Sequence, residues 1–218
     1  MRNNEWRGHL RLSHGWACYE GPAGDTSFHA HYPCQLVFAR TDEASVQLED
    51  RECRGRQLFI PSNLSHMLDQ NEEPLTLLYI EPTLLDQDID KEWSLSAWLS
   101  FLKHAEPKVE DERMISAMAN IEAALNKKVS LQAVAAASGL SKSSFTALFR
   151  KTFGMPLRRY VLWRRLYLAV QAIGRGADAT TAAHTAGFSD SAHFSRTMKT
   201  NFGVSPTESV LKITMSVQ

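Results

Sequence analysis

Hydrophobic and polar positions follow different periods in the two halves of this 218-residue chain. Between residues 8 and 82, short runs of apolar and β-branched residues are separated by clusters of Gly, Pro, Asn, Asp and Glu. The runs cover residues 35–39, 45–48, 57–60 and 75–80. Several short strands at this spacing predict a β-barrel or sandwich. Residues 89–103 then change to helical spacing, and the acidic stretch 106–112 is the expected linker.

The C-terminal half repeats one helical pattern. Segments 131–156 and 180–206 each place an Ala four residues before a Gly and a Ser two residues after it, and each closes on a Gly followed by a Pro. The inner glycines are Gly139 and Gly187, and the serines are Ser141 and Ser189. Such a Gly ends a helix in the left-handed conformation, and such a Ser caps the next helix. One copy would fit a generic helical hairpin, but the repetition favours two helix-turn-helix units.

A long helix is expected between the repeats, over residues 157–173. It begins after Pro156, a favoured residue at helix starts, and ends near Gly174. Its length of about 25 Å would hold two reading heads roughly one duplex turn apart. Its four arginines are candidates for neutralising phosphates: Arg158, Arg159, Arg164 and Arg165.

The distribution of charge separates the same two halves. The formal net charge is zero, but residues 1–110 hold 10 Lys and Arg against 18 Asp and Glu, and residues 111–218 hold 14 against 6. The net charges of the halves are therefore −8 and +8. A hydrophobic content of 44% with 22% charged residues excludes a disordered chain. The basic half is the candidate for binding nucleic acid.

Other sequence features concern the compartment. Cys18, Cys34 and Cys53 form no CxxC pair, so we expect reduced thiols rather than disulfides or a zinc finger. No run of about 18 apolar residues is present, and Met1–Trp6 lacks the apolar core of a secretory signal. These features predict a cytoplasmic chain without a membrane span.

The C-terminal half, about residues 112–211, resembles the DNA-binding domain of the AraC/XylS family of bacterial transcription regulators. The matching residues are Leu131, Phe145, Phe149, Gly154, Pro156, Tyr160, Arg165, Leu166 and Ala169, then Ala183, Gly187, Phe188, Phe194, Arg196, Gly203 and Pro206. The resemblance implies an all-α domain with two helix-turn-helix units joined by a long helix, each reading one of two adjacent major-groove segments. It also implies that Arg165 pairs inside the domain.

The expected DNA contacts of the first recognition helix follow from the resemblance and from helical spacing. Opposite its apolar stripe lie Ser143, Thr146, Ala147 and Arg150, with Lys142 as a phosphate contact. The family reads bases from the first three of these positions. Because Ala147 offers only a methyl group, which can contact thymine, we expect weak direct readout by this unit.

The second recognition helix presents Ser191, Ala192, His193 and Arg196, with Lys199 as a phosphate contact. Arg196 matches a family position that reaches bases or the adjacent backbone. A bidentate contact between Arg and guanine is worth about 1–3 kcal/mol, so we expect the loss of Arg196 to damage specificity most.

The N-terminal half resembles a small cupin barrel. His29 and His31 share one face of a strand, and the resemblance adds Gln35 and His66 as ligands of one metal ion. Gln35 stands where cupins usually have Glu, and Asn63 where they usually have Gly. Three imidazoles and a neutral amide suit zinc, nickel, copper or iron. The alternative is a barrel that uses the same pocket for a small organic effector, or for none.

We therefore expect two domains: a cupin-like all-β barrel followed by a helix over residues 1–106, and an AraC-type DNA-binding domain over residues 107–218. The predicted function is a non-enzymatic transcription activator or repressor that binds promoter DNA, with RNA polymerase and a second copy of the chain as partners. A divalent metal, or else a small organic effector, would switch it. The alternatives are a metal-dependent cupin enzyme with a helical appendage and a DNA-binding protein with an inert dimerising barrel.

Overall fold

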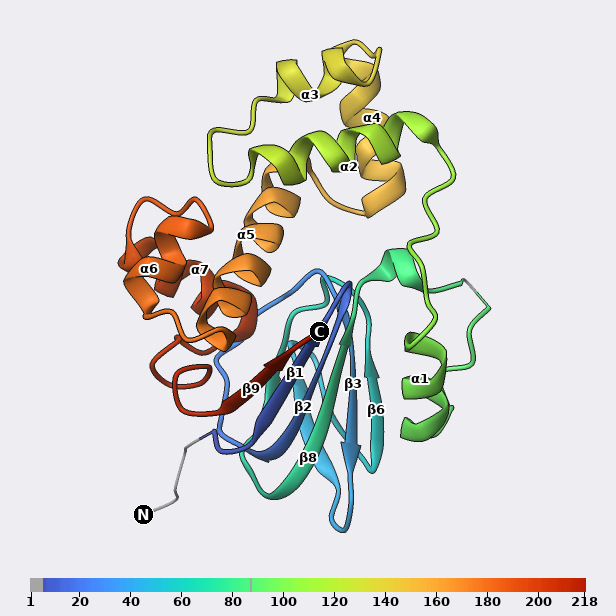
Figure 1. Cartoon of the computed structure of the whole chain (residues 1–218). Coiled ribbons are helices and arrows are strands. Elements are labelled where there is room, and N and C mark those ends of the chain that lie inside the picture. The colour runs from blue at the N-terminus through green and yellow to red at the C-terminus, as the bar shows by residue number, and fades with distance from the viewer. Residues whose placement is uncertain (1–5, 87) are drawn as a thin grey trace.

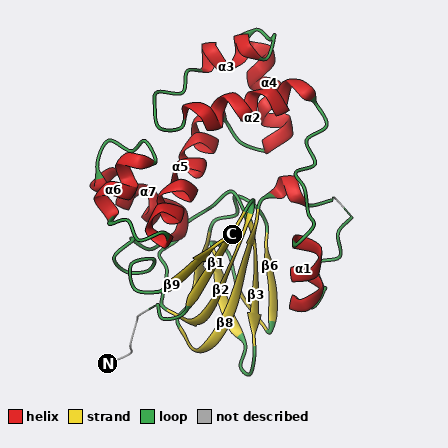
Figure 2. Cartoon of the chain, viewed as in Figure 1, coloured by secondary structure: helices red, strands yellow, loops and turns green. Residues whose placement is uncertain are grey.

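A computed structural model describes residues 6–86 and 88–218 of the chain (Figure 1). The polar segment in which no secretion signal was expected lies mostly in residues 1–5, outside the described residues. Eight strands occupy the N-terminal half (Figure 2). They are β1 His9–Ser13, β2 Trp16–Ala23, β3 Cys34–Ala39, β4 Ala44–Leu48, β5 Glu52–Gly55, β6 Gln57–Ile60, β7 His66–Leu68 and β8 Asn71–Ile80. The predicted β-rich half is thereby confirmed.

The strands form two separate sheets rather than one closed ring of hydrogen-bonded strands. The larger sheet has the order β6-β3-β8-β2-β1-β9, where β9 is Thr214–Val217, and the smaller has the order β5-β4-β7. Successive side chains of a strand face opposite sides. In the central strand β8, Leu77 joins the buried cluster that contains Leu68 of the smaller sheet, whereas Leu78 joins the cluster that contains Trp98 of α1 (Leu95–Leu102).

Six helices follow the linker. They are α2 Glu112–Ala124, α3 Leu131–Ala137, α4 Lys142–Phe153, α5 Leu157–Gly174, α6 Ala179–Thr185 and α7 Ser191–Phe202. The helix α5 matches the long helix predicted between the repeats. We call α3–α4 the first unit and α6–α7 the second unit. Within the described residues, no helix combines the length and apolar character needed to cross a membrane.

The turns inside the two units have the backbone that the repeat predicts. Gly139 and Gly187 adopt φ values of 67° and 82°, in the left-handed region. Ser141 caps α4, as expected, because its side chain accepts from the backbone N–H of Ser144. The prediction that Ser189 caps α7 is wrong: the cap is Asp190, whose carboxylate accepts from the N–H of His193 at 2.6 Å. The carboxylate displaces the neighbouring hydroxyl because it is the stronger acceptor.

One hydrophobic core joins the two halves. Leu10 and Leu12 of β1 share a buried cluster with Leu166 and Val170 of α5. The C-terminal strand β9 also pairs in parallel with β1, so red and blue strands lie side by side in Figure 1. The division of the sequence at residue 107 did not anticipate that the chain returns to the N-terminal sheet.

Two neighbouring arginines of α5 are structural. Arg164 is buried and forms ion pairs with Glu81 at 3.0 Å and Glu122 at 2.6 Å. Its proposed contact with phosphate is therefore wrong, because it is consumed by two carboxylates inside the protein. Arg165 donates to the backbone carbonyls of Leu125 and Lys127, which confirms its internal pairing.

Candidate DNA interface, histidine cluster and cavity

The first unit presents a small polar face to solvent. On α4 the side chains of Phe145 and Phe149 are buried, whereas Lys142, Ser143, Ala147 and Arg150 are exposed. Thr146 is half-buried, and its hydroxyl donates to the Lys142 carbonyl of its own helix at 2.8 Å. This face can offer a methyl group, hydroxyls and cations to a duplex.

The second unit presents a more basic face. Ala192, Arg196 and Lys199 of α7 are exposed, and Ser191 and His193 are half-buried. The His193 ring packs against the ring of Phe188, with 5.2 Å between centroids, and its Nδ1 lies 3.2 Å from the Ser189 hydroxyl. These contacts hold the imidazole at the start of α7.

A groove of about 1000 Å³ separates the two units along α5. Thr146 and His193 line it from opposite units, and its lining contains no acidic residue among those described. Lys127 and Lys128 line the groove together with Arg158. The sequence analysis had not singled out these two lysines, although a basic pair just before the Ser130 cap was visible in the sequence.

The structure brings the three predicted histidines together. The prediction that His29 and His31 share one face of a strand is wrong, because they lie in the loop between β2 and β3, where only His29 forms a β-bridge. His66 begins β7. The backbones of His29 and His66 form an isolated bridge with two hydrogen bonds of 2.9 Å. One ring nitrogen from each residue lies within 4.8 Å of the others, and all three side chains are buried. Gln35 of β3 is also buried, with its Oε1 3.0 Å from His31 Nε2 and 3.2 Å from His66 Nε2.

The hydrogen bonds fix which nitrogen of each ring faces the centre. The Nδ1 atoms of His29, His31 and His66 each lie 2.8 Å from a backbone carbonyl, which can only accept. Each Nδ1 therefore carries a proton. Burial lowers the pKa of His29 to about 3 and that of His31 to about 4, and it also lowers the pKa of His66. The rings are thus neutral, and each Nε2 presents a lone pair.

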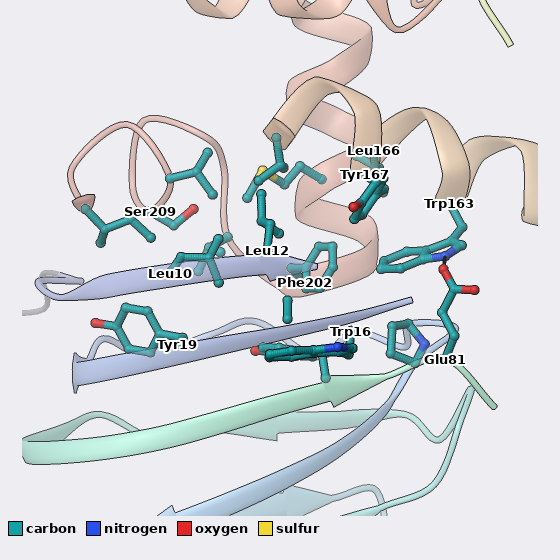
Figure 3. Close-up of a pocket in the computed structure, with 18 of the residues that line it drawn as sticks. Leu10, Leu12, Trp16, Tyr19, Glu81, Trp163, Leu166, Tyr167, Phe202 and Ser209 are labelled. Atoms are coloured by element: carbon teal, nitrogen blue, oxygen red, sulfur yellow. Dashed lines mark hydrogen bonds between the residues drawn. The ribbon is translucent and has the colours of Figure 1, made fainter. Parts of the chain in front are cut away.

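An apolar cavity of about 100 Å³ lies between the larger sheet and the helical half (Figure 3). Leu10, Leu12 and Trp16 line it from the sheet, and Trp163 and Phe202 line it from the helices. No Lys or Arg is among the lining residues described. No sequence feature predicted the cavity, because its walls come from strands and from helices more than 80 positions later in the chain.

The indole and carboxylate at the rim of this cavity are already paired. The Nε1 of Trp163 donates to Glu81 Oε1 at 2.9 Å, and the same oxygen accepts from Arg164. The interior of the cavity therefore offers mainly aromatic and aliphatic surface.

Residues 134–210 match a family of helix-turn-helix domains. A probable transcriptional regulator, LumQ of Photobacterium leiognathi, is 30% identical over 163 residues, which cover 74% of this chain and 66% of that protein. This chain thus spans just under two thirds of the length of that relative. A transcriptional regulator is also the class that the sequence predicts for this chain.

Two solved structures of ToxT share the fold. An apo variant of ToxT from Vibrio cholerae covers 91% of this chain and 97% of its own, with a TM-score of 0.62 and 11% identity. Wild-type ToxT with a bound unsaturated fatty acid covers 88% of this chain and 93% of its own, with a TM-score of 0.60 and 12% identity. The likeness confirms an architecture with a β-rich N-terminal part and a helical C-terminal part.

Proposed function

We propose that this chain, which belongs to the AraC-type regulators of transcription, binds promoter DNA with α4 and α7 and responds to an effector in its N-terminal half. The observation that carries the proposal is the pair of solvent-facing recognition helices on either side of α5. The 18 residues of α5 give a length of about 27 Å. This length is close to one turn of B-DNA, so one monomer can reach two adjacent major-groove segments.

The base contacts belong to Ser143, Thr146 and Ala147 of the first unit and to Ser191, Ala192, His193 and Arg196 of the second. Lys142, Arg150 and Lys199 contact phosphates and set the salt dependence of binding. Promoter DNA, RNA polymerase and a second copy of the chain are the proposed partners, and the cytoplasm is the proposed compartment.

DNA binding is tested by selecting duplexes from a randomised library with the full-length protein. Recovery of one enriched asymmetric site of about two helical turns supports the proposal. Binding that shows no enrichment, at a salt concentration where non-specific binding is weak, would contradict it.

The histidine cluster is the proposed effector site, and its donor set fits a divalent transition metal. Three neutral imidazoles converge through Nε2, and their protonated Nδ1 atoms are held by backbone carbonyls, as is usual for metal-binding histidines. The oxygen of Gln35 lies at hydrogen-bonding distance from two Nε2 atoms that carry no proton. An oxygen and three imidazole lone pairs that face one another are a suitable ligand set for a cation. His29, His31, His66 and Gln35 would hold zinc, nickel, copper or iron.

Metal retention is the direct test of this site. The full-length protein is equilibrated with each metal and dialysed, and bound metal per chain is measured beside a His29→Ala/His66→Ala variant. A His14→Ala/His104→Ala variant removes two exposed histidines outside the cluster and serves as the matched control. We expect about one ion per chain in the wild type and control and none in the cluster variant. Equal retention in all three proteins would contradict the site.

The cavity of Figure 3 favours a second class of effector, a small organic molecule. ToxT is similar in fold and has been solved with an unsaturated fatty acid. Among the residues that the structure describes, no cation lines the cavity to neutralise a carboxylate, and the volume of about 100 Å³ is small. The proposed ligand is therefore uncharged, apolar and no larger than a single aromatic ring. Stabilisation by toluene but not by benzoate, measured as a shift in the unfolding temperature, tests this alternative.

A further inference from the structure

The histidine cluster touches the end of the second recognition helix. Ser27 lies in the loop that carries His29 and His31, and its N–H and hydroxyl both donate to the carbonyl of Gly203, at 3.0 Å and 3.1 Å. Gly203 is the C-cap of α7. The carbonyl of Ser27 in turn accepts from His29 Nδ1 at 2.8 Å. One residue therefore orients a cluster imidazole and holds the end of the helix.

Gly203 is required for this close approach. It adopts φ 72°, and a Cβ at this position would lie 2.4 Å from the Ser27 carbonyl oxygen and 2.8 Å from His29 Nδ1. Gly154 occupies the equivalent cap of α4, with φ 67°, but a Cβ there would meet no atom within 4 Å. The two caps have the same backbone conformation, but only at Gly203 would a Cβ meet the loop that carries His29 and His31.

A second contact joins the same parts. Phe202, the last residue of α7, packs against His31 with 5.6 Å between ring centroids. It also contacts Tyr79 of β8 and Trp163 of α5, at 5.8 Å and 6.0 Å. The two histidines of the loop thus lie against the last residue of α7, Phe202, and its C-cap, Gly203.

We propose that Ser27, Gly203 and Phe202 transmit the state of the histidine cluster to the second unit, so that effector binding changes the second unit more than the first. The inference rests on the proposed metal site. The loop is fixed on its other side by hydrogen bonds from Thr26 to Leu68 and between His29 and His66. A rearrangement of the rings therefore shifts Ser27 against Gly203. Arg196 lies two turns before Gly203 on the same helix, so a shift at the cap tilts the residue expected to read bases.

Amide hydrogen exchange of the full-length chain with and without zinc tests the coupling without an operator. The amides of interest are Lys199–Gly203 at the end of α7 and Arg150–Gly154 at the end of α4. We expect zinc to slow exchange at the end of α7 by about fivefold or more, and at the end of α4 by less than about twofold.

The Ser27→Ala variant removes the hydroxyl contact without adding an atom. It should bind the same amount of zinc as the wild type, and its zinc-dependent protection at α7 should fall to less than about half. Ser45→Ala is the matched control, because its hydroxyl bonds Glu52 and Asp69 within the smaller sheet and does not touch α7. It should behave as the wild type does.

Coupling is reciprocal, so a change at the cap must also alter the cluster. Gly203→Ala should weaken zinc binding about fivefold or more, whereas Gly154→Ala should change it less than twofold. Three results would overturn the coupling but leave the metal site intact. Zinc could be retained without any change in amide exchange at α7, or amide exchange could change equally at α4 and α7. The third such result is a Ser27→Ala variant whose zinc-dependent protection at α7 equals that of the wild type. A wild type that retains no metal would overturn the metal effector, and the coupling with it.

Discussion

The two units of the helical half have nearly the same backbone, but they have different neighbours. In the first unit, Phe145 and Phe149 pack in a cluster made mainly of helical residues, to which the N-terminal half adds Tyr32. In the second unit, Phe188, Phe194 and Met198 belong to the core shared with the strands. A sequence repeat therefore specifies two copies of a motif, whereas packing decides how each copy contacts the N-terminal half.

The caps of the two units differ as well. Ser130 and Ser141 begin the helices of the first unit, and Asp178 and Asp190 begin those of the second. A hydroxyl and a carboxylate satisfy the same backbone donors, but only the carboxylate titrates. The second unit is therefore the one whose helix starts depend on pH.

The largest expected effect comes from removing the support that both units share. Arg164→Ala leaves the carboxylate of Glu81 buried with only the indole of Trp163 as a donor. Breaking such a buried pair typically costs about 3–5 kcal/mol of unfolding free energy. Denaturant unfolding measures this loss of unfolding free energy. Arg158→Ala, which removes an exposed arginine from the same helix, is the control and should change the unfolding free energy by less than about 0.5 kcal/mol. Equal losses in both variants would rule out the buried network as a support.

The next effect separates the two caps. Gly154→Ala should cost about 1–2 kcal/mol, because an Ala must adopt the left-handed conformation. Gly203→Ala carries the same strain and also forces a Cβ against Ser27, which should add about 1–3 kcal/mol. The difference between their unfolding free energies measures the contact between the second unit and the cluster loop. Equal unfolding free energies for the two variants would mean that the loop around Ser27 moves to accommodate the Cβ without loss of stability.

Substitutions on α4 and α7 should affect DNA binding in different ways. Arg196→Ala should weaken binding to a selected operator by about 1–3 kcal/mol and relax the preference at one base pair, because it removes a guanidinium from the second unit.

Ala147→Arg should add a preference for guanine in the DNA segment that faces α4, because it replaces an exposed methyl group with a guanidinium. Competition binding against single-base variants of the operator measures both. Lys199→Ala is the control and should weaken all sequences alike and lower the salt slope by about 1. A uniform loss for Arg196→Ala would reassign it to the phosphate backbone.

The smallest effect is the response to acid. Backbone hydrogen bonds, from Thr181 and from His193 respectively, hold the pKa values of Asp178 and Asp190 below the ordinary value of 3.8. These carboxylates therefore stabilise the second unit above about pH 4, and the contribution is lost as pH falls through their lowered pKa values. As pH falls through this range, amide exchange at Thr181 and His193 should accelerate relative to exchange at Ala133 and Ser144, whose amides bond to serine hydroxyls. The Asp190→Ser variant should remove the difference at His193, and parallel acceleration in all four amides would contradict the assignment.

Local features of the sequence determined much of the helical half. The left-handed glycines, the cap at Ser141 and the extent of α5 follow from conformational preferences of a few neighbouring residues. The amphipathic spacing on α4 and α7 likewise predicted which side chains face solvent. Local preference failed where two acceptors competed, as for Ser189 and Asp190 at the start of α7.

Tertiary structure decided how the parts are connected. The resemblance to a cupin suggested that His66 would meet His29 and His31, but only the fold shows all three Nδ1 atoms held by carbonyls. The pairing of β9 with β1, the burial of Arg164 and the contact between Ser27 and Gly203 join residues more than 80 positions apart. No local propensity encodes such contacts, because they depend on how whole elements pack. The sequence alone therefore determined two similar helical units, and the tertiary structure placed the end of α7 against the histidine cluster.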